Sequence, residues 1–147
     1  MYDGITRERP ISCGIYMATF STTTFLNVDL DVASPQDLAP LAKALQARLL
    51  ALHVDRIGRT YWARFELRRD PKTPDFAIRR LVAAIDALPR AARARWNRAS
   101  RRDFNVGIQA ADLPHASEFM IGSETVALVS RVGGRIVFTI YGSSLSA

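Results

Sequence analysis

Strict alternation of apolar and polar residues over two separate stretches most constrains what this chain folds into. In FLNVDLDV (residues 25–32) every second residue is apolar, and the same pattern recurs in YWARFELR (residues 61–68). Successive side chains of a strand point to opposite faces, so a period of two predicts a strand with one buried face. The residues expected to point inward are Leu26, Val28, Leu30, Val32, Tyr61, Ala63, Phe65 and Leu67.

Three other stretches predict strands, and one predicts an edge strand. LLALHV (residues 49–54) is followed by the turn sequence DRIGRT, in which Gly58 is suited to the left-handed conformation. FNVGIQA (residues 104–110) and RIVFTIY (residues 135–141) are the later strands, and EFMI (residues 118–121) is expected to be a short edge strand. The inward residues of the first of these later strands are Phe104, Val106, Ile108 and Ala110.

A helix start signal follows the first predicted strand. Ser34 is expected to cap this helix, with Pro35 at its first position and Asp37 in the capping-box slot. Its buried stripe is predicted to consist of Leu38, Leu41, Ala42, Leu45 and Leu49.

Two further helical segments carry similar signals. Thr73 and Pro74 repeat the cap-then-proline pattern, and Pro89 is expected to interrupt or restart the helix. Ser123 is expected to cap a last helix that runs to about Val132 and ends at Gly133–Gly134. The buried residues of the longer helix are predicted to be Ile78, Leu81, Val82, Ile85 and Leu88.

The order of elements is therefore β-α-β-β-α-β-α-β. This order predicts an α+β fold of ferredoxin-like type, with an antiparallel sheet and its helices packed on one face. The 147 residues, 48% hydrophobic and 23% charged, match one globular domain. We expect residues 18–147 to form this single domain. Residues 1–17 lack periodicity and contain a second candidate start, Met17, so we expect a flexible tail or N-terminal extension there.

The N-terminal sequence and the cysteine content bear on location. The sequence contains a single cysteine, Cys13, which has no partner for an internal disulfide. The first ten residues lack the basic-then-apolar order of a signal peptide, and no apolar run has the length of a membrane helix. These features predict a cytoplasmic protein with no membrane partner.

Arginines gather in one segment of the chain. Residues 79–102 contain eight arginines and one acid, a net charge of +7, while the whole chain carries +6. On a helix over residues 90–102, Ala92, Trp96 and Ala99 form a narrow buried stripe, and the arginines spread around the remaining circumference. This spread favours a solvated face with Trp96 in the core. The alternative is a site for nucleic acid or for an acidic protein, formed by Arg90, Arg93, Arg95, Arg98, Arg101 and Arg102.

A second candidate surface is the sheet face that the helices leave uncovered. The strand alternation assigns charged and aromatic residues to this face, and such a mixture is typical either of paired surface charges or of a protein-binding surface. The aromatic spacing of RNA-recognition sheets is missing, and two aspartates would repel phosphate. The predicted partner-binding residues on this face are Asp29, Asp31, Trp62, Arg64, Glu66, Arg68 and Tyr141.

Evidence of catalysis in the sequence is weak. Asp29 and Asp31 share a strand face and could act as paired carboxylates or hold a hard cation, which keeps an enzyme as a third alternative. The run from Asp112 through His115 to Glu118 lies in a predicted loop, where the spacing fixes no geometry. Nucleophile-elbow and phosphate-loop motifs are missing from the sequence. We therefore expect a non-enzymatic protein without a cofactor or metal.

The run WNRASRRDFNVGIQ, together with FMIGSET and IVFTIY, resembles a group of small uncharacterised bacterial proteins. These share a tryptophan-containing helix, a following strand and a late helix–strand unit. The resemblance covers the C-terminal third of the chain. Some small α+β proteins of this style are immunity proteins that bind a toxin, so the resemblance implies a binding role without assigning residues to it. The sequence thus predicts a cytoplasmic domain that binds another protein, either a toxin or a regulator.

Overall fold

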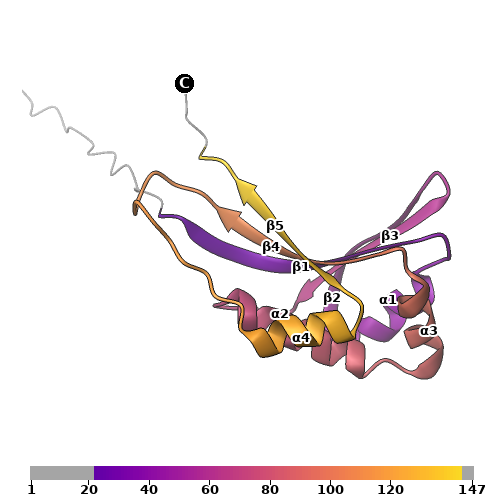
Figure 1. The fold of residues 1–147 in the computed structure, drawn as a ribbon. Coiled ribbons are helices and arrows are strands. Elements are labelled where there is room, and N and C mark those ends of the chain that lie inside the picture. Colours follow the sequence, from indigo (N-terminus) through magenta and orange to yellow (C-terminus); the bar gives the residue numbers. More distant parts are fainter. Residues whose placement is uncertain (1–21, 144–147) are drawn as a thin grey trace, which may run out of the picture.

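The computed structural model describes residues 22–143, which form one five-stranded sheet with four helices on one of its faces (Figure 1). The α+β class is therefore confirmed. The tail expected over residues 1–17, with Cys13 and Met17, lies outside the described residues. The elements in chain order are β1 (Thr24–Ser34), α1 (Ala39–Leu45), β2 (Leu49–Ile57), β3 (Thr60–Leu67), α2 (Pro74–Asp86), α3 (Arg90–Arg98), β4 (Arg101–Gln109), α4 (Ser123–Arg131) and β5 (Arg135–Tyr141).

The sheet has the strand order β2-β3-β1-β4-β5. β1 pairs antiparallel with both β3 and β4, and β2 pairs antiparallel with β3. β5 instead runs parallel to β4, so the sheet is mixed and the prediction of a wholly antiparallel sheet is wrong at this strand. The reason is that α4 carries the chain back along the sheet before β5 begins, and such a crossover places two strands in the same direction.

The core lies between the sheet and the helices. Leu30 of β1 is paired with Phe65 of β3 and Phe104 of β4, and all three side chains are fully buried. The predicted alternation is thus confirmed for most inward positions. Leu26 is an exception, because β1 bulges between Phe25 and Asn27 and leaves Leu26 exposed. The helices and the N-cap of α1 contribute the buried residues Leu38, Leu41, Ala42, Leu45, Ile78, Leu81, Val82, Ile85, Ala92 and Trp96.

The first helix begins later than the cap signal predicts. Ser34 is the last residue of β1, where it pairs with Tyr61, and its Oγ accepts a hydrogen bond from the Gln36 amide. The strand pairing therefore holds Ser34 in the sheet, and Ser34 does not cap the helix. α1 starts at Ala39, whose amide donates to Asp37 Oδ1 at 2.9 Å.

The second and third helices follow their signals closely. Thr73 is the N-cap of α2, and its hydroxyl accepts from the Phe76 amide. Pro89 separates α2 from α3, as expected from its missing amide hydrogen. Trp96 of α3 is fully buried and its indole N–H donates to the Val132 carbonyl at 2.9 Å, which confirms its place in the core.

The segment between β4 and α4 differs from the prediction. Residues 118–121 form no strand, and Met120 is 68% exposed. The edge of the sheet next to β4 is already occupied by β5, so no pairing partner remains there for this segment. α4 starts with Ser123 itself and has Gly122 as its N-cap, and it ends where Gly133 adopts a positive φ of 70°.

Candidate binding surfaces

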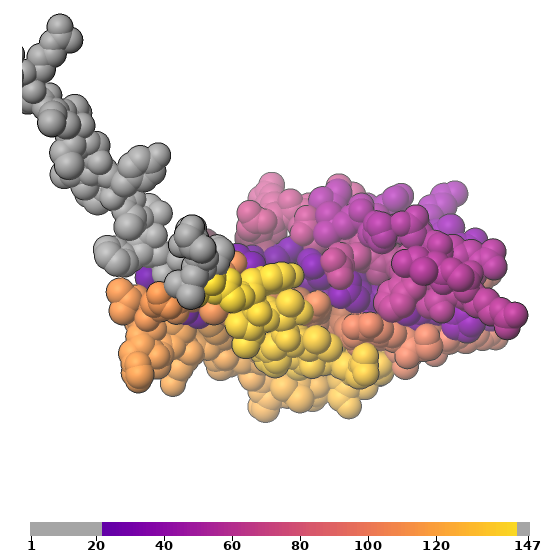
Figure 2. Space-filling model, turned by 90° about the horizontal axis from the view of Figure 1, so that it is seen from above, coloured from indigo at the N-terminus to yellow at the C-terminus, as the bar shows by residue number. Residues whose placement is uncertain are grey.

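One face of the sheet carries no helix, and Figure 2 views the molecule from that side. We call it the open sheet face and define it by the outward residues of the five strands. Across it, β3 and β4 flank β1, so side chains from three strands meet near the centre. The polar and aromatic residues of this face are Asn27, Asp29, Asp31, His53, Asp55, Trp62, Arg64, Glu66, Arg101, Asp103, Asn105, Gln109, Arg135, Thr139 and Tyr141.

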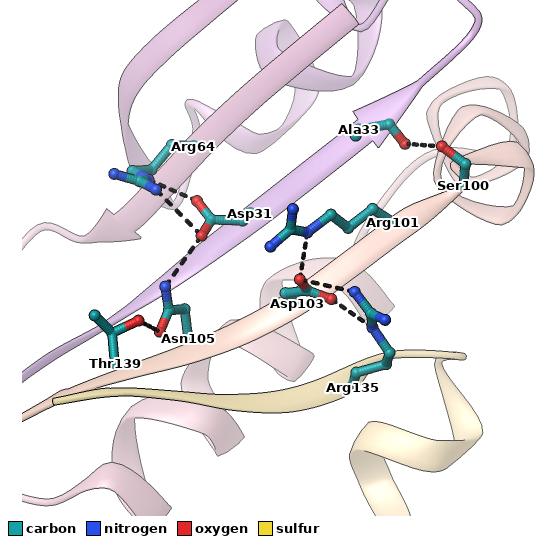
Figure 3. Close-up of polar contacts among 9 residues, drawn as sticks. All are labelled: Asp31, Ala33, Arg64, Ser100, Arg101, Asp103, Asn105, Arg135 and Thr139. Carbon is teal, nitrogen blue, oxygen red and sulfur yellow. Dashed lines mark hydrogen bonds and ion pairs between the residues drawn. The ribbon is translucent and has the colours of Figure 1, made fainter. Parts of the chain in front are cut away.

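A first cluster on this face centres on Asp31. Arg64 of β3 donates from Nε to Asp31 Oδ1 at 2.6 Å and from Nη2 to Oδ2 at 3.3 Å. From the other side, Asn105 of β4 donates to Asp31 Oδ2 at 3.4 Å, and Thr139 of β5 donates to Asn105 Oδ1 at 2.7 Å. Figure 3 shows this chain of contacts crossing four strands. Asp31 is therefore held as an ion-pair partner, with both of its carboxylate oxygens engaged.

Asp29 lies on the same face but is less well compensated. Its Oδ2 is 3.8 Å from Arg64 Nε, which lies closer to Asp31. Burial raises the pKa of Asp29; Arg64 opposes this shift, while the negative charges of Asp31 and Glu66 add to it, and the net shift is upward. The prediction that Asp29 and Asp31 share one strand face is thus confirmed, and both carboxylates lie within 4 Å of Arg64 Nε.

A second cluster centres on Asp103, which is fully buried beside two arginines (Figure 3). Arg135 donates from Nε to Oδ1 at 2.8 Å and from Nη2 to Oδ2 at 3.0 Å, and Arg101 Nε donates to Oδ2. Burial alone would raise the pKa of this carboxyl, but the hydrogen bonds from Arg135 and Arg101 outweigh burial and hold the pKa below its usual value. Asp103 therefore stays ionised and fixes the two guanidinium groups.

A hollow of about 430 Å³ opens beside the first cluster. It lies beside the register shift of β2 between Ala51 and His53, after which β2 continues to pair with β3 as far as Ile57. The Arg101 guanidinium carbon lies 5.6 Å from the ring centroid of the half-buried Trp62, within cation–π range. The lining residues are Asp31, Leu52, His53, Ile57, Trp62, Ala63 and Arg64.

The structure places most of the predicted sheet-face residues together, but not all. Asp31 and Arg64 belong to the first cluster, and Asp29 and Trp62 lie beside it. Glu66 accepts a hydrogen bond from Asn27 Nδ2 at 2.7 Å. Tyr141 stands half-exposed at the end of β5. Arg68 lies beyond the end of β3 and donates to the Gln46 carbonyl after α1, so it belongs to a different surface.

The structure also adds residues that were not predicted as sites. Asp103, Asn105 and Arg135 join the polar network, while Leu52 and Ile57 supply its apolar hollow. A signal for the β4 residues does exist in the sequence, because RRDFNVG alternates and so places Arg101, Asp103 and Asn105 on one face. Their pairing with β5 has no counterpart in the local pattern.

The predicted basic helix is shorter than expected, and its arginines contact the protein itself. α3 ends at Arg98. Arg93 Nη1 donates to the Ile85 carbonyl at 2.9 Å, and Arg95 Nη1 donates to the Asp37 carbonyl at 3.2 Å. These contacts direct the two side chains toward neighbouring helices and loops. Arg90 and Arg98 are exposed.

The last two arginines of the predicted set belong to β4. Arg101 lies on the open sheet face, whereas Arg102 Nη1 donates to the Asn97 carbonyl at 3.3 Å and so satisfies the C-terminal end of α3. The six arginines therefore point to at least two surfaces of the molecule and do not form one phosphate-tracking row.

The possible metal ligands among the described residues are not gathered into one site. Within residues 22–143, no cluster of three or more His, Cys, Asp or Glu side chains has the arrangement of a metal site. In that same part of the chain, no helix is long and apolar enough to cross a bilayer. Comparisons with protein-family models, with curated proteins and with solved structures found no match to this chain.

Proposed function

We propose that this chain is a non-enzymatic, cytoplasmic protein-binding domain whose partner docks on the open sheet face. The observation that carries this proposal is a set of arginines held in place by carboxylates on a sheet face that also carries an apolar hollow. Arg64 and Arg135 each donate two hydrogen bonds to one carboxylate, yet their side chains remain 48% and 66% exposed. Arginine and tryptophan are the residue types that most often dominate binding energy at protein interfaces.

Fixed side chains favour binding because less conformational freedom is lost when a partner arrives. Asp103 fixes Arg101 and Arg135, and Asp31 fixes Arg64, so three donors are oriented before association. Of these three arginines, Arg64 lines the hollow, which also exposes the apolar side chains of Leu52 and Ile57. We therefore propose that the partner offers an apolar side chain to the hollow and hydrogen-bond acceptors to the exposed N–H groups of these arginines.

We put forward a toxin or a regulatory protein as this partner. Support comes from the resemblance of the C-terminal third to small bacterial proteins and from the immunity role of some α+β proteins of that style. The single cysteine supports a reducing compartment. An enzyme based on Asp29 and Asp31 is the weaker alternative, since Asp31 is engaged by Arg64 and Asn105.

We also propose that β1 to β4 correspond to a ferredoxin-like unit to which β5 has been added. The order β2-β3-β1-β4, antiparallel throughout, supports this view, as do the helical segments after β1 and β3. If so, the amides of β5 should exchange with solvent before those of β1 and β3 in native-state hydrogen exchange. Equal protection of β5 and β1 would contradict an added strand.

The docking proposal is tested by affinity capture from the organism that encodes the chain, followed by binding of the purified partner. Ile57→Ser in the hollow should weaken that binding about tenfold or more, because Ile57 is an exposed apolar contact. The matched control is Val126→Ser on α4, another exposed apolar position away from the sheet face, where we expect a change of about twofold at most. Loss of binding in Val126→Ser alone would place the partner elsewhere.

The partner's class is tested by co-expression. If the captured protein is a toxin, the wild-type chain should restore growth to cells producing it, and Ile57→Ser should restore growth less well. Equal restoration of growth by the wild-type chain and by Ile57→Ser would contradict a role for the hollow.

A further inference from the structure

A second groove, of about 770 Å³, lies around the connection between β3 and α2. It is separate from the open sheet face, and it includes Arg68, which the sequence had assigned to that face. We call it the basic groove. Its lining residues are Arg48, Leu67, Arg68, Arg69, Asp70, Pro71, Lys72, Thr73, Phe76 and Arg80.

Positive charge dominates this groove. Five of its lining residues are basic, Arg48, Arg68, Arg69, Lys72 and Arg80, whereas only Asp70 is acidic. None of the five basic side chains forms an ion pair with a carboxylate of residues 22–143. Six other arginines of the described chain do form such pairs. The groove therefore concentrates uncompensated positive charge, which attracts a polyanion into a concave site.

The groove also offers an aromatic surface. Phe76, in the first turn of α2, is 54% exposed although it is a large apolar residue. Asp75 is adjacent in sequence, but its carboxylate accepts from the Gly122 amide at 2.8 Å and from Arg79 Nε at 3.1 Å, so it is engaged away from the groove. An exposed ring next to a cluster of cations suits a ligand that carries both a planar ring and several negative charges.

We propose that the basic groove binds a nucleoside polyphosphate, with the phosphates among the cations and the base against Phe76. The volume of the groove lies in the range of small-molecule sites. A compact ligand fits better than a nucleic-acid strand, because the five cations surround one hollow. On one flank, Arg79 is neutralised by Asp75 and Glu124, which ends the positive charge there.

The test measures binding of adenosine triphosphate to the purified chain by calorimetry at about 0.1 M salt, where exposed charges more than ~10 Å apart are screened. Arg69→Gln/Lys72→Gln should weaken binding about tenfold or more, because charge-assisted contacts to phosphate are lost. The control is Arg90→Gln/Arg98→Gln, which removes the same charge at exposed positions of α3. We expect that control to bind like the wild type, and equal weakening by both pairs would overturn the site.

Two further probes separate the parts of the ligand. Inorganic triphosphate should bind the wild-type chain and Phe76→Ala equally, whereas Phe76→Ala should weaken binding of adenosine triphosphate about tenfold through loss of stacking. No effect of Phe76→Ala on the nucleotide would overturn the stacking assignment. A single-stranded oligonucleotide that binds more tightly than the nucleotide would contradict a compact ligand, if the salt dependence of its affinity corresponds to several neutralised phosphates. The groove would then bind a nucleic-acid strand. These outcomes are independent of Ile57→Ser and of the sheet-face partner.

Discussion

Asp29 and Asp103 lie on the same sheet face, yet their pKa values shift in opposite directions. Each carboxyl is partly or fully removed from water, which by itself raises its pKa. Asp103 has hydrogen bonds from two arginines that outweigh this effect, whereas Asp29 shares Arg64 with a closer competitor, Asp31. The number and distance of the cations, more than burial, therefore decide which carboxylate the fold stabilises.

The stability of the protein should depend on pH through these two groups with opposite signs. Because the pKa of Asp103 is lowered in the fold, its carboxylate stabilises the protein at pH values above 3.8, the pKa of the unfolded state. This stabilisation is lost as the pH falls through the folded pKa. The raised pKa of Asp29 means that stability declines as the pH rises from 3.8 through its folded pKa. Asp29→Asn should therefore raise the free energy of unfolding at pH 7 relative to the wild type. It should also remove the decline in stability that Asp29 causes as the pH rises above 3.8. Urea unfolding at a series of pH values measures both effects.

Replacement of the buried acid should have the reverse effect. Asp103→Asn leaves Arg101 and Arg135 without a counter-charge, and we expect a loss of about 2 kcal/mol at pH 7, because both arginines are partly exposed to water. Asp55→Asn on the exposed end of β2 is the control and should change stability by less than about 0.5 kcal/mol. If Asp103→Asn leaves the free energy of unfolding unchanged, the second cluster contributes little to the stability of the fold.

Trp96 should be the most sensitive residue of α3. It is fully buried and its indole N–H donates to the Val132 carbonyl, so Trp96→Ala removes a large apolar volume and leaves that carbonyl without its partner. We expect a loss of about 3 kcal/mol or more in chemical denaturation. An unchanged denaturation midpoint would mean that the indole is exposed and available for stacking.

At the scale of the elements, the connection from α4 to β5 requires Gly134 to pack closely against Phe104 and Val129. A Cβ on Gly134 would lie 2.5 Å from Phe104 Cε2, which is too close for that ring, and 3.2 Å from Val129 Cγ1, which is a tight contact. Glycine is therefore required at this point for the chain to turn from α4 into the edge strand beside β4. The adjacent Gly133 supplies the positive φ that ends the helix.

Gly134→Ala should accordingly destabilise the fold by about 1–3 kcal/mol, because a core aromatic ring must move to accept the new methyl group. The matched control is Gly142→Ala, where a Cβ would meet nothing within 4 Å, and its thermal midpoint should stay close to that of the wild type. If both variants melt together with the wild type, Phe104 can adjust without cost, and the packing of β5 on β4 is looser than we describe.

For the whole molecule, the tertiary structure distributes the positive charge of the arginine-rich segment over several surfaces. Arg93 and Arg95 contact backbone carbonyls, Arg101 is part of the sheet-face network, and Arg102 contacts the end of α3. Five cations without an ion pair to a carboxylate of residues 22–143 line the basic groove, and only Arg80 among them comes from this segment. A linear run of arginines is therefore a poor guide to where positive charge gathers on the folded surface.

Binding of a mixed-sequence duplex should accordingly be weak and should disappear near physiological salt, because few arginines of this segment can reach one phosphate backbone together. A salt titration of duplex binding measures this, beside the variant Arg95→Ala/Arg98→Ala/Arg102→Ala. A wild-type dissociation constant below about a micromolar at about 150 mM salt, lost in that variant, would restore the nucleic-acid function of the basic segment.

The sequence by itself determined the properties that depend on near neighbours. Alternation over residues 25–32 and 61–68 predicted which strand face is buried, because side-chain direction repeats every two residues. The Thr73 cap and the burial of Trp96 likewise follow from groups within a few residues of each other. Ser34 shows where local reasoning ends, since the same cap signal was overridden by strand pairing with Tyr61.

Only the tertiary structure decided which distant segments meet. The parallel position of β5, the Arg101–Asp103–Arg135 cluster and the joining of Arg48 with residues 67–80 in one groove each combine residues that no local period connects. Their energies depend on strand order and on the number of counter-charges within hydrogen-bonding distance, and both are properties of the packed molecule. The five strands of the sheet could therefore be predicted from the sequence, whereas the candidate sites required the order in which those strands pair.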